Sequence, residues 1–574
     1  MSIEKLLQGR FSICAHGTPF KALARFYLRA VLLLIFSTYT SQISALTFQQ
    51  WQSVTSRAGS SPSDNWDGDL WSDLAEFALG SDPSSGLTVL AGTSTPAGLL
   101  ITIENDGSIV PHVWLPLDRE DIAVTLETSA DLVNWADSGI SPADTAHSSL
   151  ILRAWTLASS QTGFARLRIT LGTSVSTVTP PLGWSSVAIT PSIQTLGVTL
   201  QPKTLYAGSA YDIVGESLVL QASESRNILA NLPTDKELYV EFIEGHAEGH
   251  CVNVNLSQST STTLSLDLSH ALNTTSTLPE NIRGDRFVLR TRETLNEVFP
   301  KEWFNGGLSQ TSSDRIERWN GTGWSTWWLL DLSPGSSIRR WVQGGDSTLA
   351  SKDNTPLSNL EAFLVRRMQQ PPILYQDVGE VRVSRRRYNL AGGATFVSGA
   401  YPFDASPVQL GFVVANGFVG TTNTTTASKF NIWSGDVTPG PSPSWTSYWL
   451  FGTSTPYWVK TGTFTSVNHS PLFIANRGML FQNPSTTPLN SFLSPLPQGV
   501  ASFELPANPL LDTDNDGLHD GWEIQMFGNL ASNSLGDNDA DGISNIDEML
   551  LELNPFEPAY QNNDSTLGLL IYHK

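Results

Sequence analysis

The stretch Trp324-Ser-Thr-Trp-Trp-Leu-Leu330 recurs as Trp445-Thr-Ser-Tyr-Trp-Leu-Phe451, and this repetition indicates how the centre of the chain is built. Aromatic residues are enriched in β-strands, where successive side chains point to opposite faces. The first and last rings of each triplet therefore share one face of a predicted strand, and the middle ring lies on the other. One of these faces must pack into a core.

The segments on both sides of this stretch recur as well. The matches are 315–321 with 429–435, Trp341 with Trp458, and 356–357 with 471–472. The repeat distance varies from 114 to 121 residues, as expected when strands recur and loops differ in length. Two copies predict a duplicated β-module, which we place at residues 182–375 and 376–490, rather than a solenoid.

Residues 87–173 contain short alternating apolar stretches separated by Gly, Pro, Asp and Ser. This pattern predicts a β-sandwich module in which Trp135 belongs to the core. Residues 173–181 read as a linker. The predicted strands are 99–103, 123–127, 150–154 and 165–171.

Two acidic loops lie near the end of the chain, beginning at residues 512 and 537. Each has Asp at positions 1, 3 and 5, Gly at position 6, an oxygen side chain at position 9 and Glu at position 12, which is the ligand order of a calcium loop. Two complete copies favour calcium over solvated turns. The predicted ligands, with backbone carbonyls at position 7, are Asp512, Asp514, Asp516, Leu518, Asp520 and Glu523, then Asp537, Asp539, Asp541, Ile543, Asn545 and Glu548.

A weaker version of this pattern lies in residues 46–86. Leu70 stands where the loop needs Gly, so a calcium site and a plain capped turn both remain open. Residues 74–80 predict a short helix that ends at Gly80. The predicted ligands are Asn65, Asp67, Asp69, the carbonyl of Trp71, Asp73 and Glu76.

Several of these motifs resemble known families. The 25-residue spacing of the C-terminal loops resembles bacterial thrombospondin type 3-like calcium repeats over residues 512–556, which implies calcium binding. The W-x-G strands and the phrase Thr294-Leu-Asn-Glu-Val-Phe-Pro300 resemble an uncharacterised family of exported verrucomicrobial proteins over residues 181–490. This second resemblance brings no known activity.

The first 45 residues have the composition of an export signal. Basic residues precede a short apolar run, and Ile43-Ser-Ala45 fits a signal-peptidase site. We therefore expect a mature chain that begins near Leu46 and is secreted or held at the cell surface, with the periplasm as another location. An uncleaved anchor is the alternative, because a long extension precedes the apolar run.

The remaining chain is strongly acidic. The first 45 residues hold five of the 33 Lys and Arg residues and one of the 54 acidic ones, which leaves 28 basic and 53 acidic residues and a net charge of −25. Nucleic acid is excluded as a partner, because binding to phosphates needs basic patches. Cys251 is the one cysteine after the signal, which excludes a disulfide framework. No later apolar segment is long enough to predict a membrane span.

Catalytic motifs are scarce. The sequence has no nucleophile elbow, P-loop or C-x-x-C pair. His246, Glu248 and His250 alternate and would share one side of a strand, as a zinc site requires, but the adjacent glycines favour a hairpin tip. Carboxylate pairs for glycoside chemistry cannot be located from spacing, since the partners need only be close in space.

Together these features predict a mainly β, multidomain fold of sandwich or barrel-like modules with small helical calcium-loop segments at both ends. We expect an exported calcium-binding, non-enzymatic structural or interaction protein, with an envelope or extracellular polysaccharide or another surface protein as partner. The alternative is a carbohydrate-binding accessory protein or glycan-active enzyme; exposed rings on the repeat would favour it. The predicted order is signal peptide (1–45), EF-hand-like segment (46–86), sandwich (87–173), β-modules (182–375 and 376–490), linker (491–511), calcium repeats (512–558) and tail (559–574).

Overall fold

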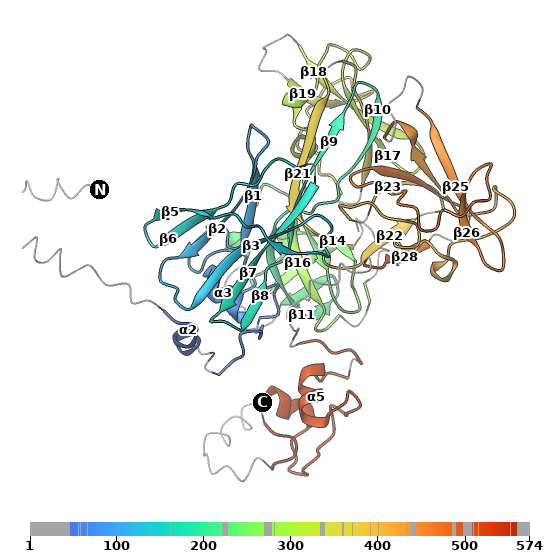
Figure 1. The fold of residues 1–574 in the computed structure, drawn as a ribbon. Coiled ribbons are helices and arrows are strands. Elements are labelled where there is room, and N and C mark those ends of the chain that lie inside the picture. Colours follow the sequence, from blue (N-terminus) through green and yellow to red (C-terminus); the bar gives the residue numbers. More distant parts are fainter. Residues whose placement is uncertain are drawn as a thin grey trace, which may run out of the picture.

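The computed structural model describes residues 46–558, except 56, 58, 66, 161, 221–227, 269–277, 280–281, 333–338, 359–360, 370, 391, 400, 437–442, 485–488, 497–507, 509, 515 and 552. The predicted signal peptide and C-terminal tail lie outside the described residues. The fold is mainly β and divided into several sheets and one small barrel, which confirms the predicted class (Figure 1).

The N-terminal part is a two-sheet sandwich covered at one end by two short helices, α2 (Phe48–Val54) and α3 (Asp73–Leu79). Residues of both sheets and of α3 form a single apolar core, in which Val113, Leu167 and Phe77 are fully buried. One sheet has the order β1 (Leu99–Ile103), β2 (Ile109–Pro116), β6 (Leu150–Ala154) and β5 (Ala143–His147). The other has the order β21 (Ile373–Glu380), β9 (Leu182–Ile189), β7 (Thr162–Leu171), β3 (Ile122–Ser129) and β4 (Ala136–Asp137). All four predicted strands of this module are confirmed.

The second sheet of the sandwich extends beyond the segment predicted for it. Strands β9 and β21 come from residues assigned to the first β-module and its end, yet β9 pairs with β7. The prediction of a linker at 173–181 is wrong, because β8 (Val175–Val178) pairs with β7 as a hairpin. The apolar alternation of this stretch is weak, so its Thr, Ser and Pro residues suggested a loop.

A closed barrel lies within the predicted first β-module. Its strands follow the order β11 (Thr204–Val214), β12 (Ser217–Leu220), β15 (Thr263–Asp267), β14 (Cys251–Val254), β13 (Leu238–Phe242) and β16 (Arg286–Thr291). Val240, Leu264 and Phe287 fill its interior. Along the chain, the barrel is inserted between residues 193–197 and 315–319, which are two strands of the same sheet. This insertion explains why the first module is longer than the second.

The duplicated stretches form two sheets with the same strand order. The first is β10 (Ile193–Gly197), β20 (Ala362–Arg366), β17 (Arg315–Trp319), β18 (Trp324–Asp331) and β19 (Arg339–Gln343). The second is β23 (Gly393–Ser398), β27 (Gly478–Asn483), β24 (Lys429–Trp433), β25 (Trp445–Phe451) and β26 (Tyr457–Lys460).

The register of the two sheets also agrees. Trp319 lies opposite Trp324, and Trp433 lies opposite Trp445. In the same pairs of strands, Trp328 lies opposite Arg315 and Trp449 opposite Lys429. The predicted equivalence of the paired tryptophans is therefore confirmed.

The two sheets contact each other reciprocally through one face. Trp319 Nε1 donates to Ala394 O at 2.9 Å, and Trp433 Nε1 donates to Ile193 O at 2.7 Å. Ile193 and Ala394 occupy equivalent positions, opposite Arg366 and Gln482. The contact is therefore an isologous, pseudo-two-fold interface formed within one chain.

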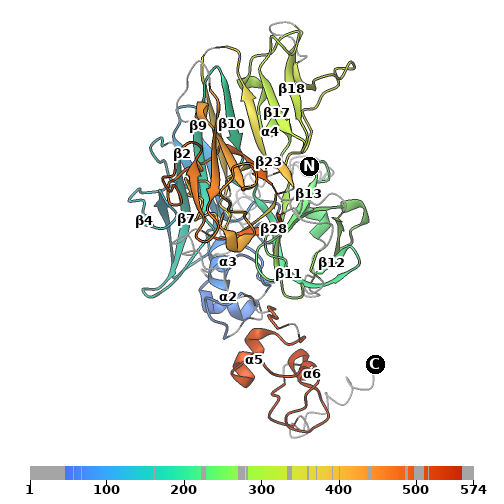
Figure 2. The same ribbon diagram turned by 90° about the vertical axis from the view of Figure 1, so that its right-hand side faces the viewer.

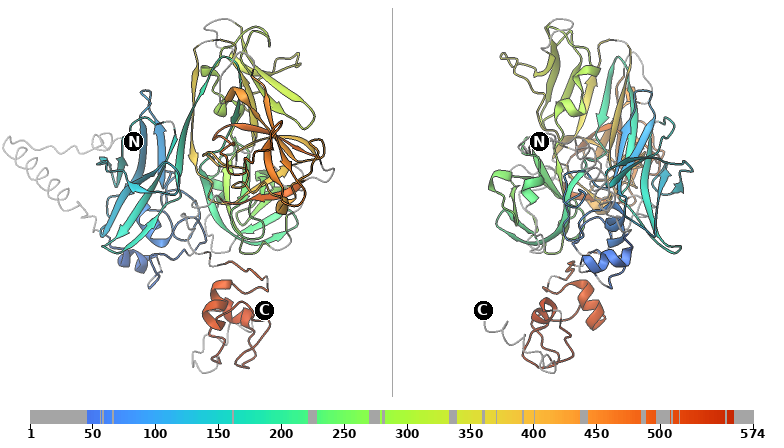
Figure 3. Two further views of the ribbon diagram at one scale, coloured as in Figure 1. Left: turned by 45° about the vertical axis from the view of Figure 1, so that its right-hand side comes forward. Right: turned by 90° about the vertical axis from the view of Figure 1, so that its left-hand side faces the viewer.

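The remaining elements are short. Strand β28 (Leu489–Ser494) pairs with β22 (Arg386–Leu390), so the second module continues four residues past its predicted end at 490. The C-terminal repeats contain α5 (Asp520–Phe527) and α6 (Asn545–Leu550), and they project from the same end of the molecule as α2, α3 and β11 (Figures 2 and 3). Other short helices are η2 (Ile228–Asn231), η3 (Leu256–Gln258), α4 (Leu295–Val298), η5 (Lys301–Trp303), η6 (Val414–Asn416) and η7 (Ser434–Asp436). Within the described chain, no helix has the length and apolarity needed to cross a membrane.

Candidate metal centres

Among the residues that the structure describes, three groups of carboxylates converge closely enough to hold a metal ion. In each group the candidate ligand atoms lie within 4.8 Å of one another. Two groups lie in the C-terminal repeats and one lies in the N-terminal loop. They are Asp512, Asp514 and Asp516; Asp537, Asp539 and Asp541; and Asp67, Asp69 and Glu76.

The first C-terminal loop turns at Gly517, whose φ of +100° favours glycine. Its amide donates to Asp512 Oδ2 at 3.0 Å, and the amide of Leu518 donates to Asp516 Oδ1 at 2.8 Å. These bonds fold the chain so that the aspartates face one point. Asp520, at position 9, is turned elsewhere and accepts the Thr513 amide at 2.7 Å.

Glu523 closes this loop from the first turn of α5. Its side chain is fully covered, and Oε1 accepts the Ser532 amide at 3.3 Å. Among the described residues, no donor bonds Oε2. Burial, and after it the negative charges of Asp516 and Asp514, raise the pKa of Glu523 to about 7.

The second C-terminal loop repeats this arrangement with small differences. Gly542, at φ +92°, donates its amide to Asp537 Oδ2 at 2.8 Å, and the Ile543 amide donates to Asp541 Oδ1 at 2.8 Å. Asn545, at position 9, is buried and donates to Asn533 O at 2.7 Å.

Several oxygens of the second loop have no hydrogen-bond donor among the described residues. These include Oδ2 of Asp539, Oδ1 of Asn545 and Oε2 of Glu548. Burial and the neighbouring aspartates raise the pKa of Glu548 to about 7. The loop therefore gathers oxygen acceptors from positions 3, 9 and 12 that lack a protein donor.

The two C-terminal loops are joined to each other. The Ser534 amide donates to Asp516 Oδ2 at 3.0 Å, so a residue just before the second loop contacts a ligand position of the first. The His519 amide also lies 3.3 Å from Met549 Sδ, between the two helices. A cation in one loop would therefore also order the approach to the other.

The N-terminal loop differs from the C-terminal pair in its turn. Its positive φ of +71° falls on Gly68, at position 4, and Leu70 at position 6 packs into the sandwich core. Asn65 Nδ2 donates to Asp69 O at 2.9 Å, and the Trp71 amide donates to Asp69 Oδ1 at 2.6 Å. The predicted helix that follows is confirmed as α3, and it ends at Gly80 with φ +75°.

The N-terminal loop is also the most deeply buried of the three. Asp67 and Asp69 are each 2% exposed, and Asp73 and Glu76 are 0% exposed. Burial, with Asp67, Asp69 and Asp73 nearby, raises the pKa of Glu76 well above its usual value. Sequence reasoning missed Ser60, which donates to Asp73 Oδ2 at 2.8 Å, because it lies outside the loop and carries no motif.

The possible zinc residues do not converge. Residues 243–250 form turns rather than a strand, so the alternation of His246, Glu248 and His250 places them on no common face. Glu248 instead pairs with the guanidinium of Arg385, at 2.7 Å from Nε. Burial lowers the pKa of His250 to about 4, so this histidine is neutral near pH 7.

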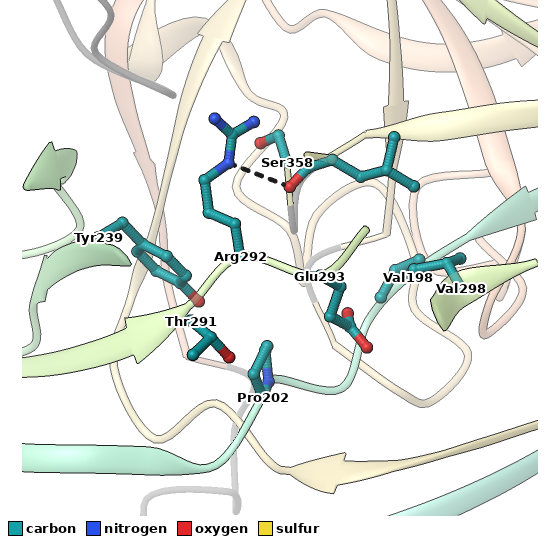
Figure 4. A pocket seen from close by; sticks show the side chains of 9 residues that line it. Val198, Pro202, Tyr239, Thr291, Arg292, Glu293, Val298 and Ser358 are labelled. Atoms are coloured by element: carbon teal, nitrogen blue, oxygen red, sulfur yellow. Dashed lines mark hydrogen bonds between the residues drawn. The ribbon is translucent and has the colours of Figure 1, made fainter. Parts of the chain in front are cut away.

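Figure 4 shows a cavity beside the barrel that is lined by Tyr239, Arg292 and Glu293. Its volume is about 10 Å³, roughly the space of one water molecule. A wider groove of about 850 Å³ lies between the barrel and the first duplicated sheet. Four of its charged side chains are paired with each other: Arg292 with Glu237 at 2.9 Å, and Arg318 with Glu361.

The aromatic rings of the repeat lie mostly inside the protein. Trp327 and Trp328 are 5% and 6% exposed, and Trp449 is 5% exposed. Trp324 lies 5.2 Å from Phe396 of the second sheet, measured between ring centroids. The second face of these strands is thus covered largely by other parts of the chain.

The chain has no match among family models, curated proteins or solved structures.

Proposed function

We propose that this protein is an exported, calcium-binding, non-enzymatic structural or interaction protein. Its β-modules would form a rigid body, and its C-terminal repeats would be ordered by calcium. One observation carries the proposal: in each C-terminal loop, three aspartates converge beside a covered Glu oxygen that has no hydrogen-bond donor among the described residues.

The chemistry of the ligands supports calcium over other metals. All candidate ligands are oxygens, which suits hard cations such as Ca²⁺ rather than Zn²⁺ or Cu²⁺. The three aspartates at positions 1, 3 and 5 and the Glu at position 12 supply more carboxylates than Mg²⁺ usually takes from protein. Sites of this kind in extracellular proteins bind with Kd on the order of 10⁻⁴–10⁻³ M.

The non-enzymatic part of the proposal is supported by the interior of the repeat. The tryptophans that would have formed a sugar-binding face are largely covered, and both arginines of the wide groove are paired with carboxylates of the same groove. These features favour a structural or interaction role over glycan chemistry.

Calorimetric titration of the mature chain with calcium tests the proposal. We expect binding in the millimolar range or tighter, and its loss in the double variant Asp516→Ala with Asp541→Ala, while the β-sheet circular dichroism stays unchanged. A wild-type chain that takes up no calcium at millimolar concentration would contradict the proposal. A glycan-binding screen of the same chain addresses the alternative, and specific binding there would replace the non-enzymatic reading.

A further inference from the structure

The buried N-terminal loop presents a different problem from the C-terminal pair. Four carboxylates lie in the interior of the sandwich end: Asp67, Asp69, Asp73 and Glu76. Both carboxylate oxygens of Glu76 lack a hydrogen-bond donor among the described residues, as do Oδ1 of Asn65 and Oδ1 of Asp73. Buried polar oxygens left in this state cost several kcal/mol each, so the fold needs a positive partner here.

The cationic side chains nearby neutralise these carboxylates only in part. The strongest charges acting on Glu76 are those of Asp67, Asp69, Asp73 and Arg57, so three like charges oppose one guanidinium. Arg57 directs Nη2 to Pro83 O at 2.8 Å. Arg286, also buried, acts on Asp67 and Asp69 but has its Nε 3.6 Å from Glu244.

The geometry suits one hard cation. Ligand atoms of Asp67, Asp69 and Glu76 lie within 4.8 Å of one another. Calcium–oxygen bonds are roughly 2.3–2.6 Å long, so oxygens around one ion lie no more than about 5 Å apart. We propose that the loop 65–76 holds one tightly bound divalent cation of the calcium class as a structural site, separate from the C-terminal sites.

The surroundings of the loop indicate what this ion would stabilise. A Cβ on Gly68 would lie 2.5 Å from Ser209 Oγ on β11, so the loop backbone presses directly on the barrel. Ser209 Oγ donates to Asn508 Oδ1 at 3.0 Å, and Asn508 Nδ2 donates to Gly284 O at 2.7 Å. Asn508 lies four residues before Asp512, the first ligand of the C-terminal repeats.

The loop therefore joins three parts of the chain: the sandwich through α3, the barrel through Ser209, and the base of the C-terminal repeats through Asn508. Ser72, at the start of α3, adds a bond of 3.1 Å to Thr177 of β8. A cation that fixes the loop also fixes the point from which the C-terminal repeats leave the body. We expect the N-terminal loop to bind this cation whether or not the C-terminal loops hold calcium.

Metal analysis of the full mature chain tests this proposal. The protein is purified in calcium, dialysed against EGTA, and its Ca, Mg, Mn and Zn contents are measured by mass spectrometry. We expect one equivalent of calcium to remain in the wild type and in the control Glu523→Gln with Glu548→Gln, and none to remain in Glu76→Gln. The control variant should instead lose the millimolar calcium binding of the C-terminal loops. The experiment therefore distinguishes an absence of calcium binding at the C-terminal loops from an absence of metal at the N-terminal loop.

Hydrogen exchange supplies a second readout. In Glu76→Gln, the amides around Asn508 and Leu510 should exchange at least tenfold faster than in the wild type, and in the control variant they should not. If Glu76→Gln does not fold, the wild type still decides the matter. Two results together would overturn the proposal. The wild type would retain no metal after dialysis against EGTA, and the control variant Glu523→Gln with Glu548→Gln would have the same melting temperature in EGTA and in calcium. Retention of zinc in place of a hard cation would do so as well.

Discussion

The N-terminal and C-terminal acidic loops use similar residue spacings in opposite surroundings. The C-terminal loops form a small unit that projects from the body (Figure 1), and their closing glutamates are buried. The N-terminal loop is part of the sandwich core, with Leu70 and Trp71 packed among its apolar residues. The same ligand pattern thus occurs once in a small projecting unit and once as a built-in part of a hydrophobic core, and we expect the two to respond differently to metal.

The strongest test of this contrast replaces the closing Glu of each loop by Gln. Removing one partner of a buried ion pair costs about 3–5 kcal/mol, so Glu76→Gln, which takes a carboxylate ligand away from the proposed buried cation, should lower the free energy of unfolding of the sandwich by roughly this amount. Glu548→Gln, in a loop that carries no part of the sandwich core, should leave that free energy nearly unchanged. Urea denaturation followed by tryptophan fluorescence measures both. Equal effects of the two changes would remove the distinction between the loops.

Chelation should affect the two regions differently. Calcium at a hundred times Kd stabilises a folded site by about 2.7 kcal/mol, so EGTA should release this stabilisation from the C-terminal repeats. The short helices α5 and α6 cannot hold the loops alone, and the repeats should lose helix and become sensitive to protease. Timed proteolysis with fragment mapping should show cleavage after residue 510 and an intact β-rich body. Cleavage that begins within the sandwich would contradict the expected difference.

A methyl group added at one glycine in each region compares how tightly the N-terminal loop and the C-terminal repeats are enclosed. Gly68→Ala combines a positive φ with a contact of 2.5 Å, and we expect it to cost about 1–3 kcal/mol. Gly521→Ala, in α5, has no atom within 4 Å of the added group and should be neutral or slightly stabilising. Thermal denaturation of the two variants measures the difference. A Gly68→Ala chain as stable as the wild type would show that the loop can move away from β11.

The smallest expected effect concerns the bond between the barrel and the base of the repeats. Ser209→Ala removes the hydrogen bond to Asn508 and should cost about 1 kcal/mol. Calcium titration of the C-terminal loops should be unchanged, while hydrogen exchange at Leu510 and Leu511 should increase. If exchange there stays at the wild-type rate, Ser209 does not connect the two regions.

Much of the local structure could be predicted, because it depends on residues close in sequence. The strands at 99–103 and 150–154 were located to the residue, and Gly80 ends α3 as its position indicated. The equivalence of Trp319 with Trp433 followed from the repeat. The convergence of the C-terminal aspartates also follows from local turns, since Gly517 and Gly542 occupy the positions that need φ above zero.

The features that could not be predicted depend on contacts between distant segments. No local pattern indicated that the barrel closes between β11 and β16, or that β9 leaves its module to join the sandwich. The burial of Glu76 is likewise a property of the packed sandwich. The predicted module boundary near 173–182 is wrong for the same reason, because β7 and β9 on its two sides belong to one sheet. The sequence of a single strand does not reveal which strand it pairs with.

The pairing of β9 with β21 has a consequence for how this chain is made. Ile189 lies opposite Ile373 and Leu182 opposite Glu380, so the partners are 184 to 198 positions apart. Contacts of such separation slow folding, because the intervening chain must be brought together before the contacts form. During synthesis from the N-terminus, the sandwich sheet lacks its edge strand until residue 380 has emerged. Truncations that end before this residue should leave β9 as an unprotected edge, and aggregation of such fragments is the expected result.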